Sequence, residues 1–177
     1  VRFADGSLVT LDDVLFGWRL AQAGHATLGF IADAFARVQS VERLDDRRFR
    51  VGIKDPHYAA LRVIGTRWLV VQQRFFVDRV AKLCAPEPAP ALDSPEFAAR
   101  LSQLDRECGP GTGAYRFDND PAGEQNWLPH QQLVLTRNEH SWRRRLEPGA
   151  WSLAGFRILF RDPQGQLNAL LRGELDW

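Results

Sequence analysis

The stretch Thr10–Gln22 places the strongest constraint on how this chain can fold. Thr10 and Asp13 have the spacing of a capping box, in which a hydroxyl and a carboxylate accept hydrogen bonds from free amides at a helix start. Behind them, apolar side chains recur every three or four residues, at Leu11, Val14, Leu15 and Trp18. That spacing puts them on one helical face. The sequence therefore predicts a helix that begins after Thr10, buries one face and ends near Gly24.

After this helix the period of the hydrophobic pattern changes to two. Alternating residues flank Asp45-Asp46, which predicts a β-hairpin formed by residues 40–44 and 48–53. On its second strand Phe49, Val51 and Ile53 are expected to face inward. The chain thus combines helices with strands, and we assign it to the α/β class, with a mixture of α and β elements.

Further elements follow from local signals. Helices are expected over residues 27–37, 58–64, 75–83 and from Pro95, capped by Ser94, to Glu107. Strands are expected over residues 115–117, 133–136 and 156–160. A last helix begins at Asp162-Pro163 and is broken by Gly173.

The charge balance argues against a nucleic-acid partner for this segment. The 177 residues carry 23 basic and 22 acidic side chains, a formal net charge of +1. A chain so close to neutral produces no strong overall field that would attract nucleic acid or an anionic membrane. The basic run Arg143-Arg144-Arg145 is expected to lie in a solvated loop, with phosphate or partner docking as the alternative.

The residues contain no pattern that is typical of an enzyme. None of the six serines lies in a G-x-S-x-G sequence, and the four histidines lack the spacing of a zinc site. The glycine-rich stretch Gly109–Gly113 lacks the Lys-Ser/Thr pair of a phosphate-binding loop. Gly111 and Gly113 are instead expected to allow positive φ or a close backbone approach. We therefore predict no catalytic residue, no metal ligand and no cofactor.

Two cysteines, Cys84 and Cys108, leave two possibilities open. In an oxidising compartment a disulfide between them would stabilise the fold by roughly 3 kcal/mol, according to loop entropy. Their spacing suits such a bridge but does not require it, and two buried thiols are the alternative.

Four local patterns, in this order along the chain, resemble one known family. They are Phe3-Ala4-Asp5-Gly6 with Thr10-Leu11-Asp12-Asp13-Val14, Gly111-Thr112-Gly113-Ala114-Tyr115, Thr136–Trp142 (TRNEHSW) and Asn168–Asp176 (NALLRGELD). Together they resemble the extracellular solute-binding proteins of family 5, the peptide- or nickel-binding components of ABC importers. Two departures stand out, because Ala114 replaces the usual proline and His140-Ser141 replaces the usual acidic-Tyr pair.

The resemblance implies a partial type II periplasmic-binding-protein-like fold. Residues 1–108 would form a helical subdomain with a β-hairpin, and residues 109–177 would supply strands and a helix of the main sheet. The chain would be a fragment of one lobe of a receptor that binds a peptide or a similar small solute between two lobes. Its partner would be an ABC permease, and its location periplasmic or extracytoplasmic and membrane-associated, as a lipoprotein.

The resemblance also implies ligand contacts at Phe30, Arg67 and Trp68, since family members place cleft-lining aromatic or basic side chains in corresponding segments. A second hypothesis is a ligand-sensing domain of a transcriptional regulator. A disulfide between Cys84 and Cys108 would favour the importer, because disulfides are rare in the cytoplasm.

Overall fold

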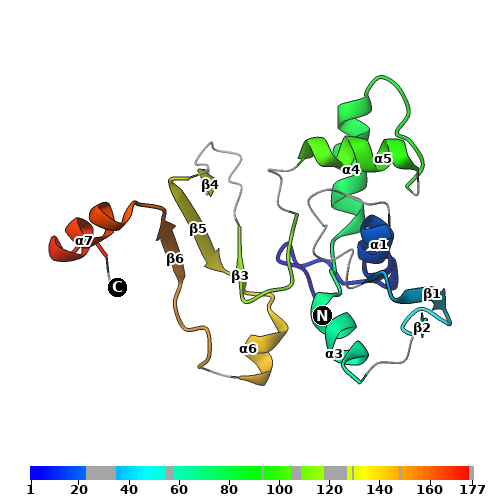
Figure 1. Cartoon of the computed structure of the whole chain (residues 1–177), viewed down its shortest axis with the longest axis horizontal. Helices are drawn as coiled ribbons and strands as arrows, with labels where there is room; N and C mark the ends of the chain where they lie inside the picture. Colours follow the sequence, from blue (N-terminus) through cyan, green and yellow to red (C-terminus); the bar gives the residue numbers. More distant parts are fainter. Residues whose placement is uncertain are drawn as a thin grey trace. The chain divides into compact units, whose positions relative to one another are not determined.

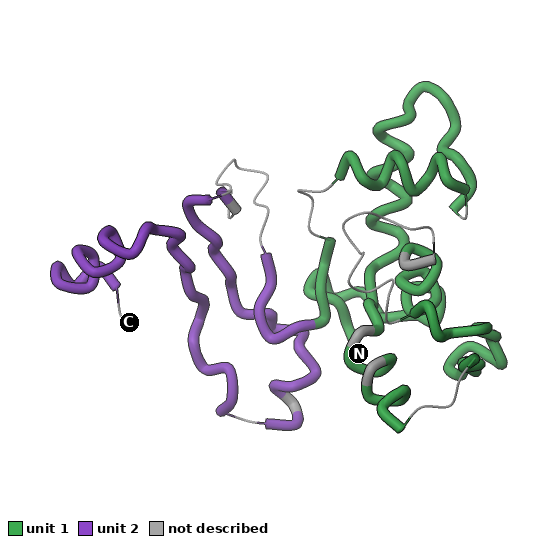
Figure 2. The backbone as a smooth tube through the Cα atoms, viewed as in Figure 1, with its two compact units in different colours: residues 1–112 green, residues 113–177 purple. Residues whose placement is uncertain are grey.

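The structure, a computed structural model, describes residues 1–22, 35–54, 58–92, 94–104, 109–117, 127–128, 130–147 and 149–175. They belong to two compact units, Val1–Thr112 and Gly113–Trp177 (Figures 1 and 2). Most of the helix expected over 27–37 lies outside the described residues, as does the end of the helix expected near Glu107. No helix in the described ranges is long and apolar enough to cross a membrane.

Unit 1 combines helices with one hairpin. Its described helices are α1 (Leu11–Gln22), α3 (Ala60–Arg67), α4 (Gln73–Cys84) and α5 (Pro95–Leu101), which continues into a 3-10 turn (Ser102–Leu104). Strands β1 (Val38–Arg43) and β2 (Phe49–Ile53) pair in antiparallel fashion, with Val41 opposite Val51. The hairpin and the helix capped by Ser94 confirm the predictions from the sequence.

The predicted capping box forms at the start of α1. The carboxylate of Asp13 accepts hydrogen bonds from the backbone amide of Thr10 at 2.8 Å and from its hydroxyl at 2.7 Å. The other carboxylate oxygen accepts the amide of Gln73 at 2.9 Å, at the start of α4. Because α4 has no side-chain cap from its own N-cap residue, this buried carboxylate joins the beginnings of two helices.

Helix α1 contributes to two hydrophobic clusters. Phe16 and Leu20 pack with residues of α4, α5 and the 3-10 turn, namely Val80, Phe97, Leu101 and Leu104. Trp18 packs against the second cluster, formed by Phe35, Val38 and Ile64. Phe16 and Leu20 are four residues apart and therefore lie on the same face of α1, whereas Trp18, two residues from each, lies on the opposite side. The two clusters therefore pack against different sides of this helix.

A glycine in the middle of α1 permits a close crossing. A Cβ atom on Gly17 would collide with the backbone carbonyl of Leu69, in the extended segment between α3 and α4. Glycine normally weakens a helix interior, and here its missing side chain makes room for another backbone.

Unit 2 is built around a small antiparallel sheet. The central strand β5 (Gln132–Arg137) pairs with β6 (Gly155–Leu159), and with β3 (Tyr115–Arg116) and β4 (Trp127–Leu128). Helix α7 (Pro163–Leu171) begins at Asp162, whose side chain accepts the amide of Gly165 at 2.7 Å. It ends before Gly173, which has a φ of 69° as the predicted break requires. The basic run Arg143–Arg145 lies in the short helix α6 (Trp142–Leu146), so the prediction of a loop was wrong.

The glycine-rich entry to β3 is held by Asn138. This buried side chain donates to the carbonyl of Gly113 at 2.8 Å and accepts the amide of His140 at 2.9 Å. Neither Gly111 nor Gly113 has positive φ, and a Cβ on either would meet open space or ordinary contacts. The expected conformational role of these glycines was therefore wrong. Their carbonyls instead accept hydrogen bonds. The carbonyl of Gly111 accepts one from the backbone amide of Ala4, and the carbonyl of Gly113 accepts one from the side chain of Asn138.

Replacing Gly17 tests the crossing. Gly17→Ala should lower the free energy of unfolding by about 3 kcal/mol, because the new methyl group has to displace a backbone carbonyl. Gly65→Ala is the matched control, since a Cβ there meets nothing within 4 Å in α3. It should raise the free energy by about 1 kcal/mol. Urea unfolding measures both changes, and equal effects at the two sites would contradict the close crossing.

Replacing Asp13 tests the double cap. Asp13→Ala should lower the free energy of unfolding by about 3 kcal/mol, because it leaves the amides of Thr10 and Gln73 without their acceptors. The control Asp12→Ala removes a neighbouring carboxylate that forms only an exposed ion pair and should cost far less. The double cap is refuted if thermal unfolding shows the two variants equally destabilised.

Candidate functional site

An open groove of about 870 Å³ lies in unit 1 along the start of α1. Apolar side chains line it from the N-terminal segment, from α1 and from the hairpin: Val1, Leu8, Val9, Leu11, Val14 and Phe49. Polar and charged side chains complete the lining: Thr10, Asp12, Arg43, Asp46 and Arg47. The described part of unit 1 thus offers a concave surface with apolar area and charges of both signs, as small-molecule sites commonly do.

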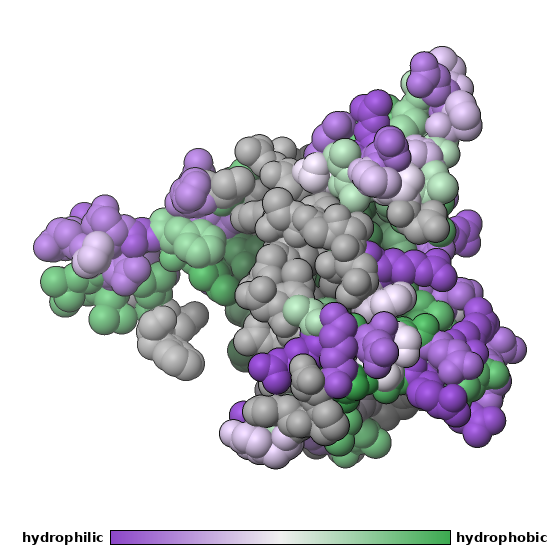
Figure 3. Space-filling model, turned by 45° about the vertical axis from the view of Figure 1, so that its right-hand side comes forward, coloured by the Kyte–Doolittle hydropathy of each residue, from purple (hydrophilic) through white to green (hydrophobic). Residues whose placement is uncertain are grey.

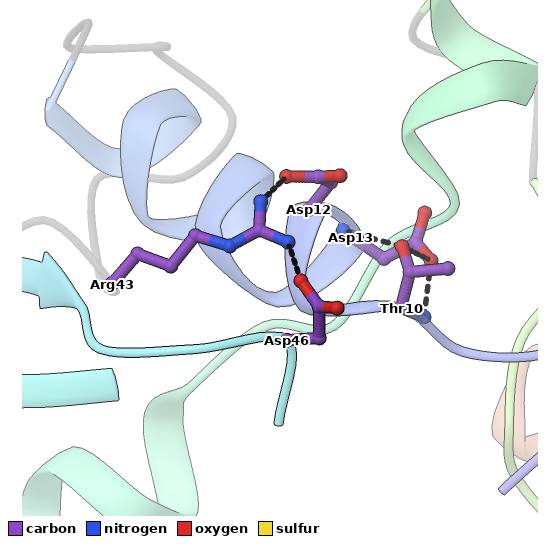
Figure 4. Close-up of polar contacts among 5 residues, drawn as sticks. All are labelled: Thr10, Asp12, Asp13, Arg43 and Asp46. Carbon is purple, nitrogen blue, oxygen red and sulfur yellow. Dashed lines mark hydrogen bonds and ion pairs between the residues drawn. The ribbon is translucent and has the colours of Figure 1, made fainter. Parts of the chain in front are cut away.

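The charged side of the groove is organised by Arg43. Its guanidinium lies between two carboxylates, 2.9 Å from Asp12 on α1 and 2.8 Å from Asp46 in the hairpin turn (Figure 4). The hydrogen bond to Asp46 and the charge of Asp12 raise the pKa of Arg43 above its usual value. The network connects the hairpin to the start of α1 and orients both carboxylates.

Arg47 is the other cation of the groove. It follows Asp46 in the hairpin turn, and its backbone amide donates to the carboxylate of Asp45 at 2.8 Å. No carboxylate of the described residues forms an ion pair with its guanidinium. Arg47 is therefore the lining residue best able to bind an anionic group of a ligand.

The N-terminal wall of the groove is anchored by Asp5. Its carboxylate accepts hydrogen bonds from the amide and hydroxyl of Ser7, at 2.9 and 2.7 Å, and from the side-chain amide of Gln72 at 2.8 Å. Partial burial acts to raise the pKa of Asp5, but the bonds from Gln72 and Ser7 outweigh it and lower the pKa below its usual value. These contacts fix the turn that precedes Leu8.

Trp68 lies behind the apolar lining of the groove. Its indole nitrogen donates to the carbonyl of Val14 at 2.9 Å, and its ring centroid lies 5.2 Å from that of Phe49. It also packs edge-on against Phe35, at 5.1 Å between centroids. Since Val14 and Phe49 both line the groove, Trp68 supports that surface from the second hydrophobic cluster.

The other predicted residues are placed less completely. Phe30 lies outside the described residues, and of Arg67 only the backbone is described, at the end of α3 beside Trp68. Cys84 is half-buried against the first cluster at the end of α4, whereas Cys108 lies outside the described residues. The ligand contacts and the disulfide therefore stay predictions.

The described lining of the groove carries apolar, polar and charged groups that can bind a solute. It contains no histidine or cysteine, and the hydroxyl of Thr10 donates to Asp13 as part of the helix cap. Among the residues that the structure describes, no group of three or more His, Cys, Asp or Glu side chains could hold a metal ion. Sequence reasoning missed Arg43, Asp46 and Arg47. The signal was present, since the predicted turn is dense in charge, but only the folded hairpin shows that Arg43 reaches Asp12 on α1.

Comparison with known proteins agrees with this fold. The family model described as bacterial extracellular solute-binding proteins, family 5 Middle, matches residues 1–177. No curated protein matches the chain. A periplasmic oligopeptide-binding protein of an oligopeptide ABC transporter from Thermotoga maritima is similar in structure, with a TM-score of 0.65 and 20% identity, over 100% of this chain and 28% of that one. NikZ from Campylobacter jejuni, solved in complex with Ni(L-His), gives a TM-score of 0.60 and 21% identity, over 99% of this chain and 29% of that one.

These similarities confirm the partial periplasmic-binding-protein fold. Because the sequence identities are only 20% and 21%, they are evidence for the fold alone. This chain spans less than a third of the length of either solved protein. The match to the family covers every residue. The chain belongs to the bacterial extracellular solute-binding proteins of family 5.

Proposed function

We propose that this chain forms part of one lobe of the substrate-binding component of an ABC importer. The observation that carries the proposal is the family match over all 177 residues. The groove supports it, because apolar side chains beside Arg43, Arg47 and two carboxylates can hold a small solute with both charged and apolar groups. The solute would be a peptide or a similar small molecule, bound between two lobes that close by a hinge motion.

Within this proposal the groove supplies one wall of the binding site. Arg47 would bind a carboxylate of the solute, since it forms no ion pair within the described residues and lines the groove. Phe30, Arg67 and Trp68 remain proposed ligand contacts, and Trp68 also supports the wall through its packing against Phe49. The protein would work outside the cytoplasm, associated with the membrane as a lipoprotein, and deliver its solute to an ABC permease.

Solute binding can be tested in the full-length protein that contains this chain. Isothermal titration with a mixture of short peptides should show binding, and Arg47→Ala should weaken it about tenfold through loss of a charged hydrogen bond. Arg62→Ala is the control, because Arg62 is exposed on α3 and does not line the groove. Failure of the full-length protein to bind any peptide or nickel chelate, or conversion of the solute to a product, would contradict the proposal.

Titration of the isolated 177-residue chain tests whether one wall of the site is sufficient for peptide binding. We expect this chain to bind the same peptides at least roughly a hundredfold more weakly than the full-length protein, because sites of this kind bury most of the ligand's surface. The same titration measures the difference. Micromolar binding by the isolated chain would show that the site is complete without a second lobe.

A further inference from the structure

A surface patch in unit 2 combines exposed apolar side chains with an arginine held between two tryptophans. We name it the α6 patch, and it consists of residues on α6 and on the segment that leads to β6: Trp142, Arg143, Leu146, Trp151 and Leu153. Leu146 and Leu153 expose 70% and 61% of their surface, and each tryptophan exposes 37%. Trp142 and Leu146 are four residues apart and therefore share a helical face.

The arginine and the rings of the patch are ordered together. The guanidinium carbon of Arg143 lies 5.4 Å from the ring centroid of Trp142 and 5.6 Å from that of Trp151, both within cation–π range. Trp151 has a φ of 60°, a conformation that bulky residues rarely adopt. Tyr115 of β3 packs edge-on against the same ring, with 6.2 Å between centroids. The sheet thus holds this tryptophan, and through it the arginine, at the surface.

The patch carries positive charge that nearby acidic residues do not neutralise. Residues 137–153 contain four arginines and two glutamates. Glu139 forms ion pairs with Arg137 and Arg144. No carboxylate of the described residues forms an ion pair with Arg143. Charge complementarity therefore favours an anionic partner.

We propose that the α6 patch docks the protein on an anionic lipid surface. Its most exposed members are leucines, which suit the acyl-chain boundary, whereas indoles and arginine suit the level of the headgroups and phosphates. Protein-binding hot spots are also rich in Trp and Arg but poor in Leu, so the leucines favour lipid over a protein partner. The inference is independent of the proposed function, because no groove residue takes part in it.

The same unit carries an apolar surface that serves as a comparison. Helix α7 exposes Leu167, Leu170 and Leu171 along one side (Figure 3). Two arginines flank this helix, Arg161 and Arg172, and both form ion pairs with Glu174. This face therefore exposes leucines beside arginines that are both paired with a carboxylate, and we expect it to contribute little to binding of an anionic lipid surface.

Vesicle flotation of the full-length protein that contains this chain tests the proposal, because there the patch is surrounded by the rest of the receptor. The protein should bind vesicles of equal parts phosphatidylglycerol and phosphatidylcholine about tenfold more strongly than vesicles of phosphatidylcholine alone. Replacing both leucines (Leu146→Ser with Leu153→Ser) should lower binding to the anionic vesicles about tenfold. Arg143→Gln should reduce the preference for anionic vesicles about fivefold. The matched control, Leu167→Ser with Leu171→Ser on α7, should bind like the wild type.

Thermal unfolding of each variant shows whether it retains the fold. We expect all of them to do so, because the substituted side chains are exposed. Equal binding to the two kinds of vesicle, or none to either, would overturn the proposal. So would an α7 variant that loses as much binding as the α6 variant, because binding would then reflect general apolar exposure. Binding of a glutamate-rich peptide that depends on Arg143, without vesicle binding, would assign the patch to a protein partner and also overturn it.

Discussion

The carboxylate of Asp13 joins the beginnings of two helices of unit 1, α1 and α4, which are distant in sequence. It accepts two hydrogen bonds from Thr10, at the end of the N-terminal segment, and one from the amide of Gln73, sixty residues further along. A buried carboxylate is costly unless hydrogen bonds replace water, and here the amides at two helix starts, which have no acceptor within their helices, supply them. Because the groove is lined by residues on both sides of Thr10, its shape depends on this cap.

Local signals in the sequence were sufficient to predict the caps and the hairpin. The Thr10–Asp13 box, the Ser94 cap and the break at Gly173 depend on hydrogen bonds or φ angles of neighbouring residues, and the structure confirms all three. The bond from Gln73 to Asp13 and the crossing at Gly17 could not be predicted, because each joins segments more than fifty residues apart. Helix α6 was not predicted, because a run of three arginines is typical of a solvated loop.

The candidate site shows the same division between local and long-range information. The sequence indicated a charged turn after β1, but the pairing of Arg43 with Asp12 requires the hairpin to fold against α1. Trp68 was predicted as a ligand contact from family resemblance, and the structure places it behind Val14 and Phe49 of the groove lining. An aromatic residue of this kind stabilises a binding surface through packing even where it does not touch the solute.

We propose that these residues form a wall around a solute and carry out no reaction on it. A crystal structure of the full-length protein with its bound solute tests this claim most directly. The claim predicts intact solute, held without a covalent bond, with groove residues such as Arg47 or Phe49 within about 4 Å of it. A solute that lies away from every residue of this chain, or one covalently attached to a side chain of it, would contradict the claim.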